Sequence, residues 1–244
     1  MTRPLIYEAR APLSRCGASY GQYLLRDVLA GEVSAEVLVF LSAWALDGDQ
    51  RARLKRIAAD RVALWCYAPG YHDGDRESLA AMQDLTGFVV QKTEQKPAMA
   101  EPTETGRRLG LSESFGIEDT VRPLFAVADA RPEEVLATYP DGSAAVAMRE
   151  NGDGVSLVVL APRISADLLR LAARRAGVHL FTEDGCVLYA NDPYLVLHGS
   201  GKGENTIRLT TGRRQPVLDG LTGETVGHGP RVTVPLSFGE TRIL

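Results

Sequence analysis

The sequence predicts an α/β domain followed by a small antiparallel β domain. In the first part of the chain, apolar runs at 37–41 and 61–67 are separated by a segment with helical spacing. After residue 178, short strand-like runs are separated by glycine-rich turns. Alternating strands and helices are typical of a parallel sheet with right-handed crossovers, whereas closely spaced short strands are typical of a sandwich or barrel. We therefore expect one domain over 1–183 and a second over 184–244.

The elements expected in the first domain follow from apolar spacing and from capping residues. Asp47 is a suitable N-cap for a helix over 48–59, and Gly31 is a suitable C-cap for a helix over 20–30. The continuous apolar runs indicate strands buried on both faces. The predicted helices are 20–30, 48–59, 76–85 and 164–178, and the predicted strands are 37–41, 61–67, 88–90, 124–128, 135–139, 143–149 and 155–161, with a hairpin turn at 141–143.

Residues 91–122 interrupt this pattern. The stretch QKTEQKPAMAEPTETGRR is polar, contains two prolines and shows no periodicity. We expect a long loop or insertion there.

The second domain is expected to be a small β-sandwich. Its predicted strands are 186–190, 194–198, 205–210, 215–218, 231–236 and 241–244. The segment GSGKGEN at 199–205 lacks the order of a phosphate-binding loop and precedes no helix, so we expect a flexible hairpin there.

Composition and charge exclude several classes of protein. The 244-residue chain has a net charge of −4, so a basic face for nucleic acid is not expected. No window approaches 18 consecutive apolar residues, so no membrane span is expected. The first residues lack the apolar core of a signal peptide. If the chain is complete as given, we expect a cytoplasmic location.

The nucleophiles and metal-ligand types are scattered. Cys66 lies within a strand between bulky neighbours, and Cys16 and Cys186 lack the glycine-flanked elbow of an activated nucleophile. We expect all three to be reduced and buried. His72, His179, His198 and His228 occur without ligand spacing, and no dinucleotide fingerprint is present. We therefore predict no catalytic residue, no metal and no cofactor.

The loop at 68–75 is the one local cluster with functional promise. Asp73 and Asp75 follow a buried strand, and open α/β sheets bind ligands where their parallel strands end. Aromatic rings and hydrogen-bonding groups suit a carbohydrate, or equally a buried interface. The simpler interpretation is a solvated turn in which aspartates favour the bend. The candidate ligand-binding residues are Trp44, Tyr67, Tyr71, His72, Asp73 and Asp75.

Three stretches resemble one protein family. They begin at RCGASYGQYLLRDVLAG, VALWCYAPGYHDGD and RAGVHLFTEDGCVLYAND, and the most recognisable pieces are YAPG at 67–70, LTG at 85–87 and AGVH at 176–179. Together they resemble the C-terminal region of β-galactosidase-like, family-42-type glycoside hydrolases. The resemblance implies a trimerisation domain with a flavodoxin-like, class I amidotransferase-like fold, followed by a small β-sandwich. The catalytic glutamates of that family belong to a (β/α)8 barrel, so none of them carries over to this chain.

These observations support three hypotheses of different classes. The leading one is a non-catalytic accessory or oligomerisation module of a glycoside hydrolase, in a homo-oligomer, most simply a trimer, or in association with a catalytic barrel. The second is a carbohydrate- or small-molecule-binding module that uses the loop at 68–75. The third is a stand-alone hydrolase built on Asp73, Asp75 or Cys66.

Overall fold

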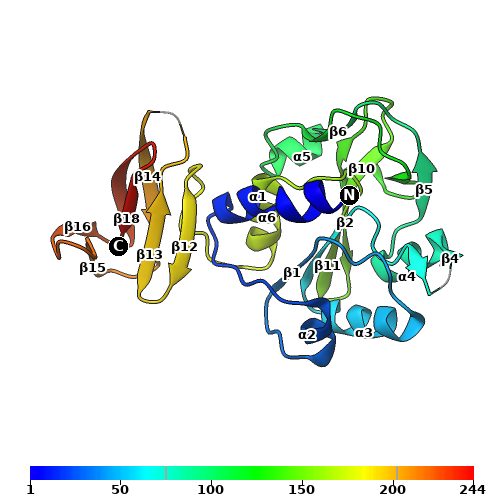
Figure 1. Ribbon diagram of the computed structural model, residues 1–244, viewed down its shortest axis with the longest axis horizontal. Helices are drawn as coiled ribbons and strands as arrows, with labels where there is room; N and C mark the ends of the chain where they lie inside the picture. Colours follow the sequence, from blue (N-terminus) through cyan, green and yellow to red (C-terminus); the bar gives the residue numbers. More distant parts are fainter. Residues whose placement is uncertain (75, 202) are drawn as a thin grey trace. The chain divides into compact units, whose positions relative to one another are not determined.

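The computed structural model describes residues 1–74, 76–201 and 203–244 (Figure 1). These residues form two compact units. Unit 1 comprises Met1–Ala9 and Gln22–Ala176, and unit 2 comprises Arg10–Gly21 and Gly177–Leu244. An N-terminal segment therefore groups with the C-terminal unit, which a linear division at residue 183 does not anticipate.

Unit 1 is built on one mixed sheet with few helices. Its helices are η1 (Arg3–Tyr7), α2 (Leu25–Ala30), α3 (Gly48–Ala58), α4 (Leu79–Thr86), α5 (Glu104–Arg108), η2 (Pro132–Glu134) and α6 (Ala166–Arg175). Its strands are β1 (Val37–Phe40), β2 (Val62–Cys66), β3 (His72–Asp73), β4 (Arg76–Glu77), β5 (Val90–Thr93), β6 (Ala98–Pro102), β7 (Phe115–Ile117), β8 (Leu124–Val127), β9 (Val135–Thr138), β10 (Ala144–Asn151) and β11 (Gly154–Val159).

The main sheet runs in the order β1-β2-β11-β10-β9-β6-β7, and β8 joins it by pairing with both β10 and β5. β1, β2 and β11 are mutually parallel, and they lie side by side in Figure 1. The other pairings are antiparallel. The expectation of a parallel sheet is therefore correct only for these three strands.

Local sequence signals explain the elements around these parallel strands. The Asp47 side chain accepts a hydrogen bond from the Gln50 backbone N–H at 2.8 Å, as expected of the N-cap of α3. β2 is buried at every position, which confirms the strand predicted at 61–67. β11 lies beside β2, and α6 packs against β2. The hairpin at 141–143 joins β9 and β10 as predicted.

The third parallel strand was predicted wrongly. Residues 88–90 were expected to continue the parallel sheet, but β5 begins at Val90 and pairs antiparallel with β8. The exposed Gln91 and Lys92 in β5 fit a peripheral strand, whereas the apolar β11 takes the buried place beside β2. β1 is an edge strand whose alternate residues are half-buried, so the prediction that it is buried on both faces is also wrong.

Residues 91–122 are not a long loop. They contain the end of β5 together with β6, α5 and β7. Ala98 and Ala100 are fully buried, but such small side chains give a weak hydrophobic pattern. At Gly106 a Cβ atom would lie 2.1 Å from the Leu136 backbone oxygen, so close backbone packing and not a large apolar face holds α5. An analysis of hydrophobic spacing therefore gives almost no signal for β6, α5 and β7.

The predicted helix at 20–30 is shorter than expected. α2 begins at Leu25 and ends at Ala30, and the C-cap Gly31, with a φ of 81°, closes it in the left-handed region. Tyr23 lies outside the helix and is largely exposed. The aromatic spacing that suggested a longer helix therefore reflects no buried helical face.

The described residues of unit 2 form one helix and three small antiparallel sheets. The sheets are β12-β13-β18, β14-β17 and β15-β16. The bounds are α1 (Arg10–Arg15), β12 (Val187–Asn191), β13 (Tyr194–His198), β14 (Glu204–Thr210), β15 (Pro216–Leu218), β16 (Thr225–His228), β17 (Arg231–Ser237) and β18 (Thr241–Ile243). The six predicted strands are confirmed, and β16 was not predicted.

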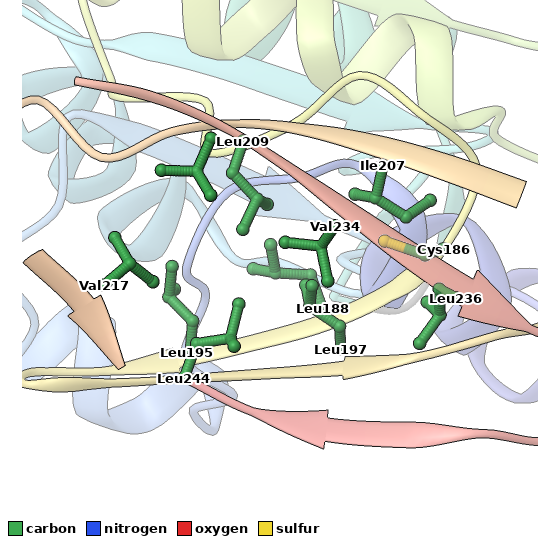
Figure 2. Close-up of a cluster of buried hydrophobic side chains, with 11 residues drawn as sticks. Cys186, Leu188, Leu195, Leu197, Ile207, Leu209, Val217, Val234, Leu236 and Leu244 are labelled. Atoms are coloured by element: carbon green, nitrogen blue, oxygen red, sulfur yellow. The ribbon is translucent and has the colours of Figure 1, made fainter. Parts of the chain in front are cut away.

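Alternating apolar residues give unit 2 its own core. Figure 2 shows the side chains of this core. Leu188 and Leu197 of β12 and β13 lie in the same cluster as Ile207 and Val234 of β14 and β17. Segment 199–205 connects β13 to β14, which belong to different sheets, so it does not close a hairpin; its Lys202 lies outside the described residues.

Candidate functional site

The predicted ligand-binding residues follow the parallel strands β1 and β2. Trp44 lies in the loop after β1, and Tyr67 is the first residue after β2. His72 connects the two loops: its backbone N–H donates to the Trp44 carbonyl at 2.9 Å, and its own carbonyl accepts from Leu46 N–H at 3.0 Å. The structure thus brings these loops together at the carboxyl edge of the parallel strands. Asp75 lies outside the described residues.

The aromatic side chains of this edge pack on one another. The Trp44 and Tyr67 ring centroids lie 5.5 Å apart, and Phe125 of β8 lies 5.6 Å from Tyr67 and 4.9 Å from Tyr71. Tyr67 and Tyr71 are 2% and 4% exposed. Burial raises the pKa of the Tyr67 phenol to about 12, and the neighbouring Tyr71 adds to this. Their ring faces are therefore occupied by protein, as in a core.

Tyr67 has an unusual backbone. Among the non-glycine residues that the structure describes, it is the one with a positive φ, 61°. Its N–H donates to the Val159 carbonyl at 2.7 Å, and its hydroxyl donates to the Pro123 carbonyl. Contacts at both ends of the residue therefore hold a conformation that costs of order 1–2 kcal/mol for a side chain with a Cβ.

Asp73 takes part in a partly buried ion-pair network. Its Oδ1 accepts a hydrogen bond at 2.8 Å from Arg51 of α3, whose guanidinium also donates to the Leu46 carbonyl at 2.8 Å. Arg51 is 9% exposed, and Asp84 lies 3.6 Å from its Nε. Lys55 donates to Asp84 at 2.6 Å. The carboxylate of Asp73 therefore fastens the β3–β4 hairpin to α3.

His72, Arg76 and Glu77, in strands β3 and β4, are exposed. The Tyr71 hydroxyl donates to Glu77 at 2.5 Å, and Lys92 donates to the same carboxylate at 3.1 Å. These two hydrogen bonds lower the pKa of Glu77, and the one from Tyr71 has the larger effect. The His72 side chain is exposed, and its ring lies 5.6 Å from that of Tyr71.

We expect Asp73→Asn to destabilise unit 1 by about 1–2 kcal/mol, because the buried Arg51 would exchange its nearest carboxylate for a neutral acceptor and keep only the more distant Asp84 as a charged partner. Urea unfolding at neutral pH measures this loss. Asp49→Asn, on the first turn of the same helix α3, is the matched surface control. An Asp73→Asn variant as stable as the wild type would show that the ion pair contributes nothing.

The predicted residues line neither of two open pockets of about 370 Å³ each among the described residues of unit 1. The first is lined by Lys92, Thr93, Glu94, Arg122, Pro123 and Leu124. The second is lined by Met99, Ser114, Phe115, Gly116, Ile117, Glu118 and Arg163. Ligand binding by the loop at 68–75 stays a prediction, which calorimetric titration with oligosaccharides tests.

Sequence reasoning missed the residues that complete this edge. Arg51 lies on a helix face that the sequence suggests is solvent-facing. Phe125 of β8 and Tyr139, which directly follows β9, lie far along the chain. Tyr139 is 2% exposed with its hydroxyl unpartnered, and the Trp44 indole N–H is likewise buried without a partner. No local motif predicts such long-range contacts. The sequence indicated only that the apolar run at 124–128 is a strand.

The three cysteines are buried, as predicted. Cys66 is 0% exposed, and burial raises the pKa of its thiol far above the usual range. A thiol held in the neutral form is a poor nucleophile. Within the described residues, no group of three or more His, Cys, Asp or Glu side chains could hold a metal ion. No helix among the described residues is long and apolar enough to cross a membrane.

We expect Cys66→Ala to cost about 1–2 kcal/mol of stability through the small cavity it leaves, and to change no activity. Denaturant unfolding measures the cost. The native Cys66 thiol should react with a thiol reagent only as unit 1 unfolds, and rapid labelling of Cys66 in the folded protein would contradict its burial.

Comparison with known proteins finds likeness in solved structures alone. No family model matches the sequence, and no curated protein matches it. The β-galactosidase from Bacillus circulans sp. alkalophilus matches with a TM-score of 0.67 and 18% identity, over 98% of this chain and 36% of its own. A catalytic mutant of Gan42B, a GH42 β-galactosidase from G. stearothermophilus, matches with a TM-score of 0.62 and 16% identity, over 98% and 35%. The β-galactosidase from Rahnella sp. R3 matches with a TM-score of 0.58 and 15% identity, over 86% and 32%. The chain spans about a third of the length of these enzymes, and it shares the fold of that third.

Proposed function

We propose that this chain acts as a non-catalytic accessory and oligomerisation module of a β-galactosidase-like glycoside hydrolase. One observation supports the proposal most strongly. Nearly all of this chain matches a β-galactosidase chain, but the match covers only about a third of that enzyme. A (β/α)8 barrel alone takes about 250 residues. The sheet of unit 1, with three parallel strands and antiparallel neighbours, is of a different architecture.

Within this proposal, the α/β domain is the trimerisation domain, of flavodoxin-like and amidotransferase-like architecture, and the small C-terminal domain is a β-sandwich. Two observations support the first assignment. The β1–α3–β2 unit with β11 is a parallel core, and Tyr67 has a positive φ immediately after β2. A nucleophile elbow has a sharp turn at such a strand end, and in this chain a buried tyrosine lies at that turn. The expected partners are two further copies of this chain, or a catalytic barrel.

The chemistry of the described residues supports a non-catalytic role. All three thiols are buried, burial keeps that of Cys66 neutral, and the Asp73 carboxylate is engaged by Arg51. A stand-alone hydrolase would need a nucleophile or an acid–base pair that substrate can reach. Cys66 is fully buried, the half-buried Asp73 carboxylate is held by Arg51, and Asp75 lies outside the described residues.

Hydrolysis of chromogenic galactosides and esters tests the non-catalytic assignment. The purified chain should release no more chromophore than buffer does. Turnover proportional to chain concentration that survives in Cys66→Ala but disappears in Asp73→Asn would contradict the proposal and restore the hydrolase hypothesis.

A further inference from the structure

The outward face of the β12-β13-β18 sheet in unit 2 has an unusual composition. Residues that lie directly opposite in antiparallel strands share one face of a sheet. Leu188 pairs with Leu197, and both are buried in the core, so the alternate pairs point outward. None of these eight outward side chains is an Asp, Glu, Lys or Arg. They are Val187, Tyr189, Asn191, Tyr194, Val196, His198, Thr241 and Ile243.

The neighbouring β14-β17 pair shows what an ordinary solvent face of this unit looks like. Its inward residues, such as Ile207 and Val234, are buried. Its outward positions include Glu204, Arg208 and Arg231 among threonines and a serine. The β12-β13-β18 face therefore lacks the charges that the β14-β17 face carries, in a chain in which 24% of residues are charged.

Three tyrosines dominate the uncharged face. Tyr189 and Tyr194 are 55% and 56% exposed. Because Tyr194 pairs with Asn191, two residues along from Tyr189, the two tyrosines are diagonal neighbours on the same face. Tyr20, from the N-terminal segment of unit 2, adds a third ring 6.3 Å from that of Tyr189. Partial burial, together with the phenol of Tyr189, raises the pKa of Tyr20 to about 12, so the Tyr20 hydroxyl stays protonated at neutral pH.

We propose that this tyrosine face (Tyr20, Tyr189 and Tyr194 with the outward residues of β12, β13 and β18) binds a neutral carbohydrate chain. The C–H faces of sugar rings stack on aromatic rings, and phenol hydroxyls offer hydrogen bonds to sugar hydroxyls at the same time. Asn191 and the pair His198–Thr241, joined at 2.9 Å, supply further polar groups around the rings. An uncharged face matches a ligand without charge, and it offers nothing to a polyanion.

This proposal goes beyond the assembly role, because it assigns a ligand to unit 2. The choice of galactose-containing probes rests on the proposed function. The probes are soluble β-galactan, galactomannan, xyloglucan and, as a charged comparison, polygalacturonate, each cast into a native gel. Galacto-oligosaccharides then give an affinity by calorimetry. The variants are Tyr194→Ala, which leaves the Tyr20–Tyr189 contact in place, and Tyr189→Ala with Tyr194→Ala. Tyr23→Ala is the matched control, since Tyr23 is 62% exposed and belongs to unit 1.

The wild-type chain and Tyr23→Ala should be retarded equally by at least one neutral polysaccharide and not by polygalacturonate. Tyr194→Ala should weaken binding about tenfold, and the double variant should abolish retardation. The proposal is overturned if no neutral polysaccharide retards the wild-type chain, or if the double variant is retarded as strongly as the wild type. A change in molecular mass of the double variant by light scattering, without any carbohydrate binding by the wild type, would identify the face as a protein contact. Loss of carbohydrate binding with an unchanged mass leaves the assembly proposal standing.

Discussion

Arg149→Met should destabilise unit 1 by about 3 kcal/mol, because it leaves a buried carboxylate without its main partner. Arg149 of β10 donates to both oxygens of Glu134 at 2.9 Å, and Glu134 is 5% exposed. The same guanidinium donates to the Gly87 carbonyl at 2.8 Å and lies 4.2 Å from the Phe88 ring centroid. One side chain thus joins β10, η2 and the end of α4. Urea unfolding at pH 7, followed by tryptophan fluorescence, measures the loss.

Arg131→Met is the matched control for this effect. Arg131 also donates to Glu134 at 2.9 Å, but its own side chain is 67% exposed. Water already screens that charge, so its loss should cost under about 1 kcal/mol. Equal losses in the two variants would contradict the view that the buried arginine holds the network.

The stability of unit 1 should fall in acid through the same carboxylate. Hydrogen bonds from Arg149, and then from Arg131, outweigh desolvation and lower the pKa of Glu134 from 4.5 to about 2. A depressed carboxyl pKa stabilises the folded state fully above the unfolded pKa, and the stabilisation disappears as pH falls from about 5 towards 2. The shift corresponds to about 3 kcal/mol, of which about 2 kcal/mol is lost by pH 3.

Glu134→Gln isolates this contribution, because the other carboxylates titrate in both proteins. The wild type should exceed the variant in free energy of unfolding at pH 7, and the difference should shrink by about 2 kcal/mol at pH 3. A difference between the two proteins that stays constant from pH 7 to pH 3 would show that the folded-state pKa of Glu134 is not depressed.

Strong local signals made part of the fold predictable. The N-cap at Asp47 is visible through its capping side chain, and β2 and the alternating strands of unit 2 are visible because they bury many apolar side chains. β6, α5 and β7 lacked that signal. They are held by alanines, by Gly106 against the Leu136 backbone and by pairing with a distant strand. The order of strands in the sheet could not be predicted for a related reason. No local sequence feature specifies that β11, and not β5, lies beside β2.

The place of the candidate residues in the fold was predictable from the sequence, and their role in ligand binding stays a prediction. The expectation that loops after parallel strands gather at one edge correctly placed Trp44, Tyr67 and Tyr71 near one another. Two of their contacts come from elsewhere in the sequence and could not be predicted. Phe125 packs against the Tyr71 ring, and Arg51 forms an ion pair with Asp73. The tyrosine face of unit 2 was missed because Tyr189 and Tyr194 alternate with core residues and resemble ordinary strand residues.

The mass of the purified chain in solution tests the central claim, an oligomerisation module, most directly. Multi-angle light scattering at tens of micromolar, in physiological salt, should return three times the 26.4 kDa of one chain, about 79 kDa. A mass that holds on dilution to a few micromolar would fit an interface of the size that permanent assemblies bury. A single species of 26.4 kDa throughout this range would contradict the account.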